Sequence, residues 1–162
     1  PSILPEDAYG SPRPSAATSF VAKRRNQWAS AEEMAERFRD RSPFAGWDPR
    51  VLSDYCAHGL MPDPAGSGFV LACAPDAEAA IYSQTATSTP YLDISRIELP
   101  VRIIRARQRP ETGTFDMSYS PTAPDLVRRF ANATDECLQE YSHYLPMEAP
   151  QLVAEYIQSI VC

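Results

Sequence analysis

The spacing of apolar residues is mainly helical over the first 90 residues. Met34 and Phe38 lie one helical turn apart, behind Ser30-Ala-Glu-Glu33, which matches a capping box. Asp48 followed by Pro49 is typical of a helix start, and Gly59 of its end. The pattern predicts four helices, over 15–28, from Ser30 to the Ser42-Pro43 stop, over 49–58 and over 75–82. A loop over 61–68 and a short extended piece over 69–73 are predicted between the last two helices. We therefore expect residues 15–90 to form a helical layer without a sheet.

From residue 94 the pattern changes to alternating strand and helix. Leu99-Pro-Val-Arg-Ile-Ile-Arg-Ala106 is a β-branched apolar run, typical of a buried parallel strand. A loop over 107–123, a helix over 125–130, a strand over 134–140, a loop over 141–148 and a helix from Pro150 are predicted to follow. This order indicates the end of a parallel α/β sheet. We divide the chain into a linker and helical cap over 1–92 and a core over 93–162.

Two strands are too few for a stable parallel sheet, because both faces and both edges need partners. The sequence has no internal repeat that would supply more strands, so we expect the others upstream of Pro1. Residues 1–14 contain four prolines and Gly10, which predict an extended linker from a preceding segment. Processing of the start is the alternative explanation for a first residue that is not Met.

Composition and charge exclude several classes of function. The 162 residues are 44% apolar and 22% charged, which suits one globular core. A net charge of −6 disfavours nucleic acid as a partner. No apolar run reaches the roughly 18 residues of a membrane span, and no secretory leader opens the chain. Four widely spaced cysteines and two distant histidines predict no metal site, and we expect no cofactor.

His143 is the candidate catalytic residue. It lies in Tyr-Ser-His-Tyr-Leu-Pro-Met-Glu, on a loop between the last predicted strand and the last helix. Catalytic groups collect at the carboxyl end of strands in open parallel sheets. Histidine also accepts and returns a proton near neutral pH without large changes in its pKa. The alternative is a structural or solvated loop histidine.

Two segments resemble the C-terminal half of α/β-hydrolase-fold enzymes. Ser142-His-Tyr-Leu-Pro-Met-Glu-Ala-Pro150, followed by residues 152–157, is similar to the family's catalytic-histidine loop and final helix. Pro100-Val-Arg-Ile-Ile-Arg105 resembles the strand that introduces the catalytic acid, and the helical layer resembles the cap. Through residues 115–122 and 41–49 the chain looks most like fungal toxin-biosynthesis and peroxisomal-lipase-like hydrolases. The resemblance implies a serine hydrolase of fungal secondary metabolism that cleaves an ester or thioester, or a cyclase with the same triad.

The resemblance also implies a triad whose nucleophile is missing from this chain. Such enzymes carry it in a Gly-x-Ser-x-Gly elbow ahead of the cap, and Gly66-Ser67-Gly68 reads only as a flexible turn. We expect the N-terminal portion of the same protein to carry the elbow, and this chain alone to be inert. For the acid, the family's spacing favours Asp116 over Glu111. An acid upstream of Pro1 is one alternative, and a turn-capping role for Asp116 is another.

The sequence departs from the family where the usual Gly-x-x-Asp would follow the strand, because it reads Ala106-Arg-Gln-Arg109. That departure keeps two other functions open. An aspartate nucleophile would make the protein an epoxide hydrolase or dehalogenase, and loss of turnover would leave a binding protein.

Trp28 and Trp47 are candidate substrate-binding residues. Aromatic side chains of the cap would suit a small apolar ester-like substrate, although they would equally form the cap's own core. The C-terminal Ser159-Ile-Val-Cys162 is not a Ser-Lys-Leu signal, so a peroxisomal address is not supported and we expect a cytoplasmic one.

Overall fold

The computed structural model describes residues 3–10, 20–84, 86–110, 116 and 118–161. The chain divides into two compact units. The first unit comprises Pro1–Ser11 and Ala86–Leu145, and the second comprises Pro12–Thr85 and Pro146–Cys162. The division into a cap over 1–92 and a core over 93–162 stays a prediction. No helix in the described ranges is both long and apolar enough to cross a bilayer.

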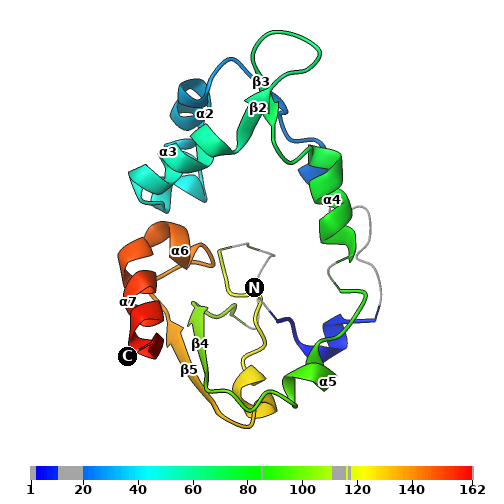
Figure 1. Ribbon diagram of the computed structural model, residues 1–162, viewed down its shortest axis with the longest axis vertical. Helices are drawn as coiled ribbons and strands as arrows, with labels where there is room; N and C mark the ends of the chain where they lie inside the picture. The colour runs from blue at the N-terminus through cyan, green and yellow to red at the C-terminus, as the bar shows by residue number, and fades with distance from the viewer. Residues whose placement is uncertain (1–2, 11–19, 85, 111–115, 117, 162) are drawn as a thin grey trace. The chain divides into compact units, whose positions relative to one another are not determined.

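The second unit combines helices with a small antiparallel sheet. Its helices are α2 (Ala31–Phe38), α3 (Pro49–His58), α4 (Pro75–Gln84) and α7 (Pro150–Val161), with a 3-10 turn η2 (Phe44–Gly46). The strands β1 (Gln27–Trp28), β2 (Leu60–Pro62) and β3 (Phe69–Leu71) pair in the order β1-β3-β2, and Figure 1 labels β2 and β3. The helices predicted over 49–58, over 75–82 and from Pro150 are confirmed.

Helices α2 and α3 begin at their predicted capping residues. The hydroxyl of Ser30 accepts a hydrogen bond from the amide of Glu33 at 3.2 Å. The carboxylate of Glu33 accepts one from the amide of Ala29 at 2.8 Å, one residue earlier than the capping box predicts. Asp48 caps α3 by accepting from the amide of Arg50 at 2.8 Å. These bonds satisfy amides that have no partner inside a helix.

The prediction of a helical layer without a sheet is wrong, because β1, β2 and β3 form a sheet, but the short extended piece predicted over 69–73 contains β3 and is confirmed. Residues 20–22 are helical, but the helix predicted over 15–28 gives way to β1, and residues 15–19 lie outside the described ranges. The loop predicted over 61–68 contains the end of β2. Strands of two or three residues are too short to leave a periodic pattern of apolar positions, and cross-strand pairing alone defines them.

Gly68 closes the β2–β3 hairpin in a left-handed backbone conformation, with φ +96°. A Cβ atom at this position would lie 2.7 Å from the backbone oxygen of Trp28. We expect Gly68→Ala to lower the free energy of unfolding by about 1–3 kcal/mol, because an L side chain is strained there. Urea unfolding followed by tryptophan fluorescence measures the loss.

Gly66→Ala is the matched control, because its Cβ atom would meet nothing closer than Asp63 Oδ2 at 3.9 Å. Equal losses in the Gly66 and Gly68 variants would show that the backbone conformation of Gly68 is not the cause.

The first unit is built on a parallel strand pair. β4 (Val101–Ala106) pairs with β5 (Ala133–Leu138), with Val101 opposite Ala133 (Figure 1). The unit also contains the 3-10 turns η1 (Glu6–Ala8) and η3 (Leu126–Arg129) and the short helix α5 (Tyr91–Ile94), and α6 (Leu145–Glu148) begins at its last residue. The parallel pairing confirms both predicted strands. The helix predicted over 125–130 is the 3-10 turn η3, and the loop predicted over 141–148 contains α6.

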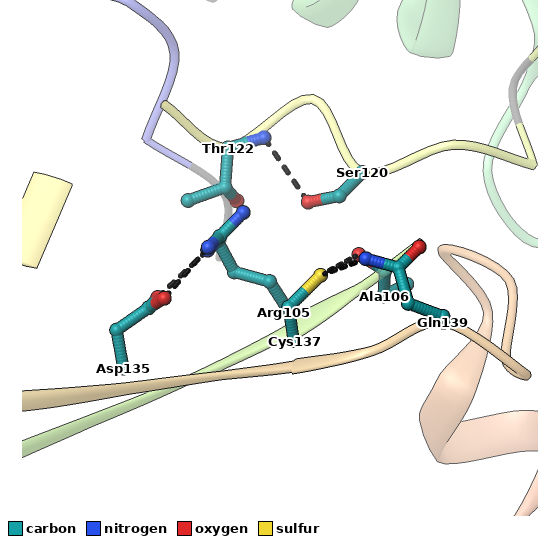
Figure 2. Close-up of polar contacts among 7 residues, drawn as sticks. All are labelled: Arg105, Ala106, Ser120, Thr122, Asp135, Cys137 and Gln139. Carbon is teal, nitrogen blue, oxygen red and sulfur yellow. Dashed lines mark hydrogen bonds and ion pairs between the residues drawn. The ribbon is translucent and has the colours of Figure 1, made fainter. Parts of the chain in front are cut away.

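One face of β4 packs against a hydrophobic core. Ile103 contacts this core, whose buried members are Tyr91, Ile94, Ala123 and Leu126. Arg105 lies on the same face, because alternate residues of a strand share a face. Its guanidinium is buried and binds the carboxylate of Asp135 on β5 through two hydrogen bonds, Nε to Oδ1 at 2.7 Å and Nη2 to Oδ2 at 2.6 Å (Figure 2). The buried face of β4 therefore contains the Arg105–Asp135 ion pair as well as the apolar core.

In the described part of the chain, β4 pairs with a single strand. Val101 donates its amide to the carbonyl of Asn132 on the side of β5. In a parallel pair the residues between such donors, here Arg102 and Ile104, direct their backbone groups to the opposite edge. Among the described residues, β5 is the one strand that pairs with β4.

Candidate active site

His143 lies at the carboxyl end of the β4–β5 pair, as the sequence predicts. Three backbone hydrogen bonds join the loops at this end. Arg107 donates to the carbonyl of Tyr141 at 3.1 Å, and Ser120 donates to the carbonyl of Arg107 at 2.9 Å. The amide of His143 donates to the carbonyl of Ser118 at 2.8 Å. The loop after β4 and the loop after β5 therefore meet beside His143.

The imidazole of His143 is about half buried. Its ring lies 5.7 Å from the ring of Tyr144, centroid to centroid. Burial lowers the pKa of His143 below the ordinary value of about 6.5, because the imidazolium loses hydration. The hydroxyl of the buried Ser142 accepts from the amide of Tyr144 at 3.1 Å and fixes the turn that carries the histidine. A neutral imidazole at pH 7 is able to accept a proton.

We expect His143 to titrate below pH 6.5 in the folded protein, which NMR of its Cε1–H resonance measures directly. Since the pKa is lower in the folded state, the unfolded state binds more protons between the folded pKa and about 6.5. The contribution of His143 to stability is therefore complete above about pH 6.5. It is lost as the pH falls towards the folded pKa, and it changes no further below that value. A midpoint at or above 6.5 would contradict the burial argument.

Asp116 is exposed, and its carboxylate bonds within its own loop. Its Oδ1 accepts from the amide of Ser118 at 2.8 Å, and the hydrogen bonds from the amide and side chain of Ser118 lower the pKa of Asp116. Ser118 in turn accepts from the amide of His143. The two candidate catalytic residues thus lie on loops joined by a hydrogen bond, but no described contact joins the carboxylate to the imidazole. The bond to Ser118 is the turn cap considered as the alternative role.

Asp116 as the triad acid stays a prediction. The other candidate in this loop, Glu111, lies outside the described residues.

Trp28 and Trp47 belong to the second unit and are both buried, with 4% and 8% of their surface exposed. They lie in an aromatic cluster of Trp28, Phe38, Phe44, Trp47 and Tyr55. Phe38 contacts Trp28 at 5.4 Å and stacks on Phe44 at 4.2 Å, centroid to centroid. Trp47 contacts Phe44 at 4.8 Å and Tyr55 at 5.4 Å. The cluster forms part of the unit's core, and Trp28 also lines an open depression beside the 65–68 turn. Substrate contact by either tryptophan stays a prediction.

Arg107 is a residue of this site that the sequence pattern did not single out. Its guanidinium lies 5.5 Å from the ring centroid of Tyr119, and its buried Nε has no hydrogen-bond partner among the described residues. The sequence signal that could have identified Arg107 is the segment Ala106-Arg-Gln-Arg109, which stands where the usual Gly-x-x-Asp would follow the strand. In the described ranges, no three His, Cys, Asp or Glu side chains lie close enough to hold a metal ion.

Two solved structures with a similar fold are hydrolases. The peroxisomal α/β-hydrolase Lpx1 from Saccharomyces cerevisiae superposes with a TM-score of 0.70 at 16% identity, over 93% of this chain and 40% of that chain. E-2-(acetamidomethylene)succinate hydrolase superposes with a TM-score of 0.61 at 14% identity, over 93% of this chain and 54% of that chain. No protein-family model matches the sequence, and no curated protein matches it.

These likenesses concern the fold, because the sequence identities are low. This chain spans about half the length of the similar structures. The narrower resemblance to fungal toxin-biosynthesis hydrolases stays a prediction. Coverage of 93% of the chain, together with the parallel β4–β5 pair, shows that the chain adopts part of an α/β-hydrolase fold.

Proposed function

We propose that this chain is the cap and histidine-bearing part of a serine hydrolase that cleaves an ester or thioester. The observation that carries the proposal is the position of His143. Its half-buried imidazole follows the carboxyl end of a parallel strand, in a fold shared with hydrolases. The lowered pKa keeps this imidazole neutral at pH 7, which is the form that a general base requires.

In the proposed reaction, His143 takes the proton of a serine hydroxyl while the serine oxygen attacks the carbonyl carbon. It then returns the proton to the leaving alcohol or thiol, and water releases the acyl group by the same two transfers. Asp116 is the proposed acid that orients the imidazole and stabilises its cation. Its lowered pKa keeps the carboxylate ionised, and the Ser118–His143 bond holds its loop beside the histidine loop. A substrate with an internal nucleophile would be cyclised by the same triad.

A preceding segment supplies the serine in this proposal. The printed sequence contains no Gly-x-Ser-x-Gly elbow. The two-stranded β4–β5 sheet supports this step, because a parallel sheet needs more strands than the described residues supply. The similar structures are about twice as long as this chain, which leaves length for such a segment.

The proposed substrate is a small apolar ester, with Trp28 and Trp47 contacting its acyl group. The sequence supports this assignment because aromatic side chains of a cap suit an apolar acyl group, and in the folded unit both tryptophans belong to its buried aromatic cluster. A fungal secondary-metabolic role and a cytoplasmic location complete the proposal and rest on the sequence resemblance.

Ester hydrolysis by the chain with and without the preceding segment tests the proposal. We expect this chain alone to hydrolyse 4-nitrophenyl hexanoate no faster than buffer, and the protein that contains both parts to turn it over. Equal rates in both samples would place the nucleophile in this chain and contradict the proposal. Turnover of an epoxide or haloalkane in place of the ester would indicate an aspartate nucleophile, and ligand binding without turnover would indicate a binding protein.

A further inference from the structure

Arg105 and Arg107 lie on one side of the chain at the carboxyl end of β4. They differ in whether a described carboxylate neutralises the guanidinium. Arg105 is neutralised by its two hydrogen bonds to Asp135. Arg107 forms no ion pair with any described residue. Its Nε is buried without a hydrogen-bond partner in the described part of the chain. A partly buried guanidinium of this kind is costly unless an anion approaches it.

Arg105 provides a second donor on the same side. Its Nη1 is buried and has no hydrogen-bond partner in the described ranges, although its Nε and Nη2 bind Asp135. Residues two apart in an extended strand lie about 7 Å from each other with side chains on one face. The bridge between Gln108 and Ser120 shows that the chain stays extended past Arg107. Two unsatisfied guanidinium donors therefore follow one another along this face.

The backbone of Arg107 is tied to the loops of the candidate active site. Its amide bonds to Tyr141, two residues before His143, and its carbonyl bonds to Ser120. Ser118, two residues earlier in the same loop, bonds to the amide of His143. The guanidinium and the imidazole are thus anchored on the same short network of backbone hydrogen bonds.

We infer that Arg107, with Nη1 of Arg105 as a second donor, binds a carboxylate group of the substrate. This inference rests on the proposed function and adds one acidic group to the apolar ester-like substrate. A guanidinium has a planar fork of N–H donors that matches a carboxylate. The ring of Tyr119 lies 5.5 Å from the guanidinium carbon and adds a cation–π contact that holds the group in place.

Asp116 is the described carboxylate that competes for this charge. Arg107 contributes to its lowered pKa, but hydrogen bonds from Ser118 are the larger cause, and no described ion pair joins Asp116 to Arg107. The arginine is therefore available for an external acid.

A matched pair of esters tests the inference in the protein that contains both parts. 4-Nitrophenyl hydrogen adipate carries a free carboxylate, and 4-nitrophenyl hexanoate has the same chain length without one. We expect Arg107→Gln to lower the ratio of kcat/KM for the acid over the neutral ester by about 10- to 100-fold. Arg128→Gln removes the same charge from an exposed arginine of η3 and should leave the ratio unchanged. An unchanged ratio in Arg107→Gln would overturn the inference.

Propionate binding gives a readout that does not need activity. At constant ionic strength, propionate should shift the Nε–Hε resonance of Arg107 in a saturable way, and neutral propionamide should not. A response to both compounds, to neither, or equally at Arg128 would overturn the inference. If neither ester is turned over at all, the proposed function fails, and the propionate titration alone decides whether the carboxylate site exists.

Discussion

Replacement of His143 by alanine is expected to lower kcat of the protein that contains both parts by roughly 10⁴- to 10⁶-fold. Without the imidazole, the proposed reaction loses the general base that takes the proton of the attacking serine. The serine would then attack as a weakly nucleophilic alcohol. The residual rate would come from substrate binding and from stabilisation of the oxyanion. Steady-state hydrolysis of 4-nitrophenyl hexanoate measures the loss.

His58→Ala is the matched control for this experiment. His58 is exposed at the end of α3, in the second unit, and has no part in the proposed reaction. We expect its activity to stay within about twofold of the parent, as for a surface substitution away from the site. Circular dichroism should show the same folded signal for the parent and both variants. A His143→Ala protein that is folded and fully active would contradict the assignment of the general base.

The second large effect is on stability and concerns the buried Arg105–Asp135 pair. Asp135→Ala leaves the guanidinium of Arg105 buried without its counter-charge. We expect the free energy of unfolding to fall by about 3–5 kcal/mol, since the lost carboxylate no longer offsets desolvation of the cation. Urea unfolding of the folded protein measures this difference. Asp135→Ala combined with Arg105→Leu should recover part of the loss, because the double variant buries no unpaired charge.

The Arg102–Glu136 pair on the opposite face of the same strands is the internal comparison. The side chains of Arg102 and Glu136 are 35% and 42% exposed, and Nη2 of Arg102 lies 3.0 Å from Oε2 of Glu136. Glu136→Ala should cost at most about 1 kcal/mol, because water screens the interaction and hydrates the remaining charge. Similar losses in Glu136→Ala and Asp135→Ala would show that burial of the Arg105 pair does not determine its strength.

Local signals in the sequence predicted most of the helices and the strand pair. A serine or aspartate cap needs only the amides two or three residues ahead of it, so Ser30 and Asp48 mark the starts of α2 and α3 without tertiary information. The β-branched run before Ala106 likewise predicts β4, because buried parallel strands are apolar on both faces. The sheet of β1, β2 and β3 was missed because its strands depend on pairing between distant segments.

The candidate site was predictable only where it follows directly from a strand end. His143 comes a few residues after β5, so its place at the sheet edge follows from chain connectivity. The position of Asp116 depends on the path of a long loop, which its residue types do not determine. The burial of Arg105 depends on the register of β4 and β5, because Val-Arg-Ile-Ile-Arg-Ala does not indicate which arginine faces the core.

Covalent labelling with a fluorophosphonate tests the central claim most directly, because this reagent forms an adduct with an activated serine. The protein that contains both parts would be treated, digested and analysed by mass spectrometry. We expect one adduct on a serine of the preceding segment, and its loss in the His143→Ala variant. An adduct on a serine of this chain, such as Ser67, or labelling that persists without His143, would contradict the claim that His143 activates a nucleophile supplied from outside these 162 residues.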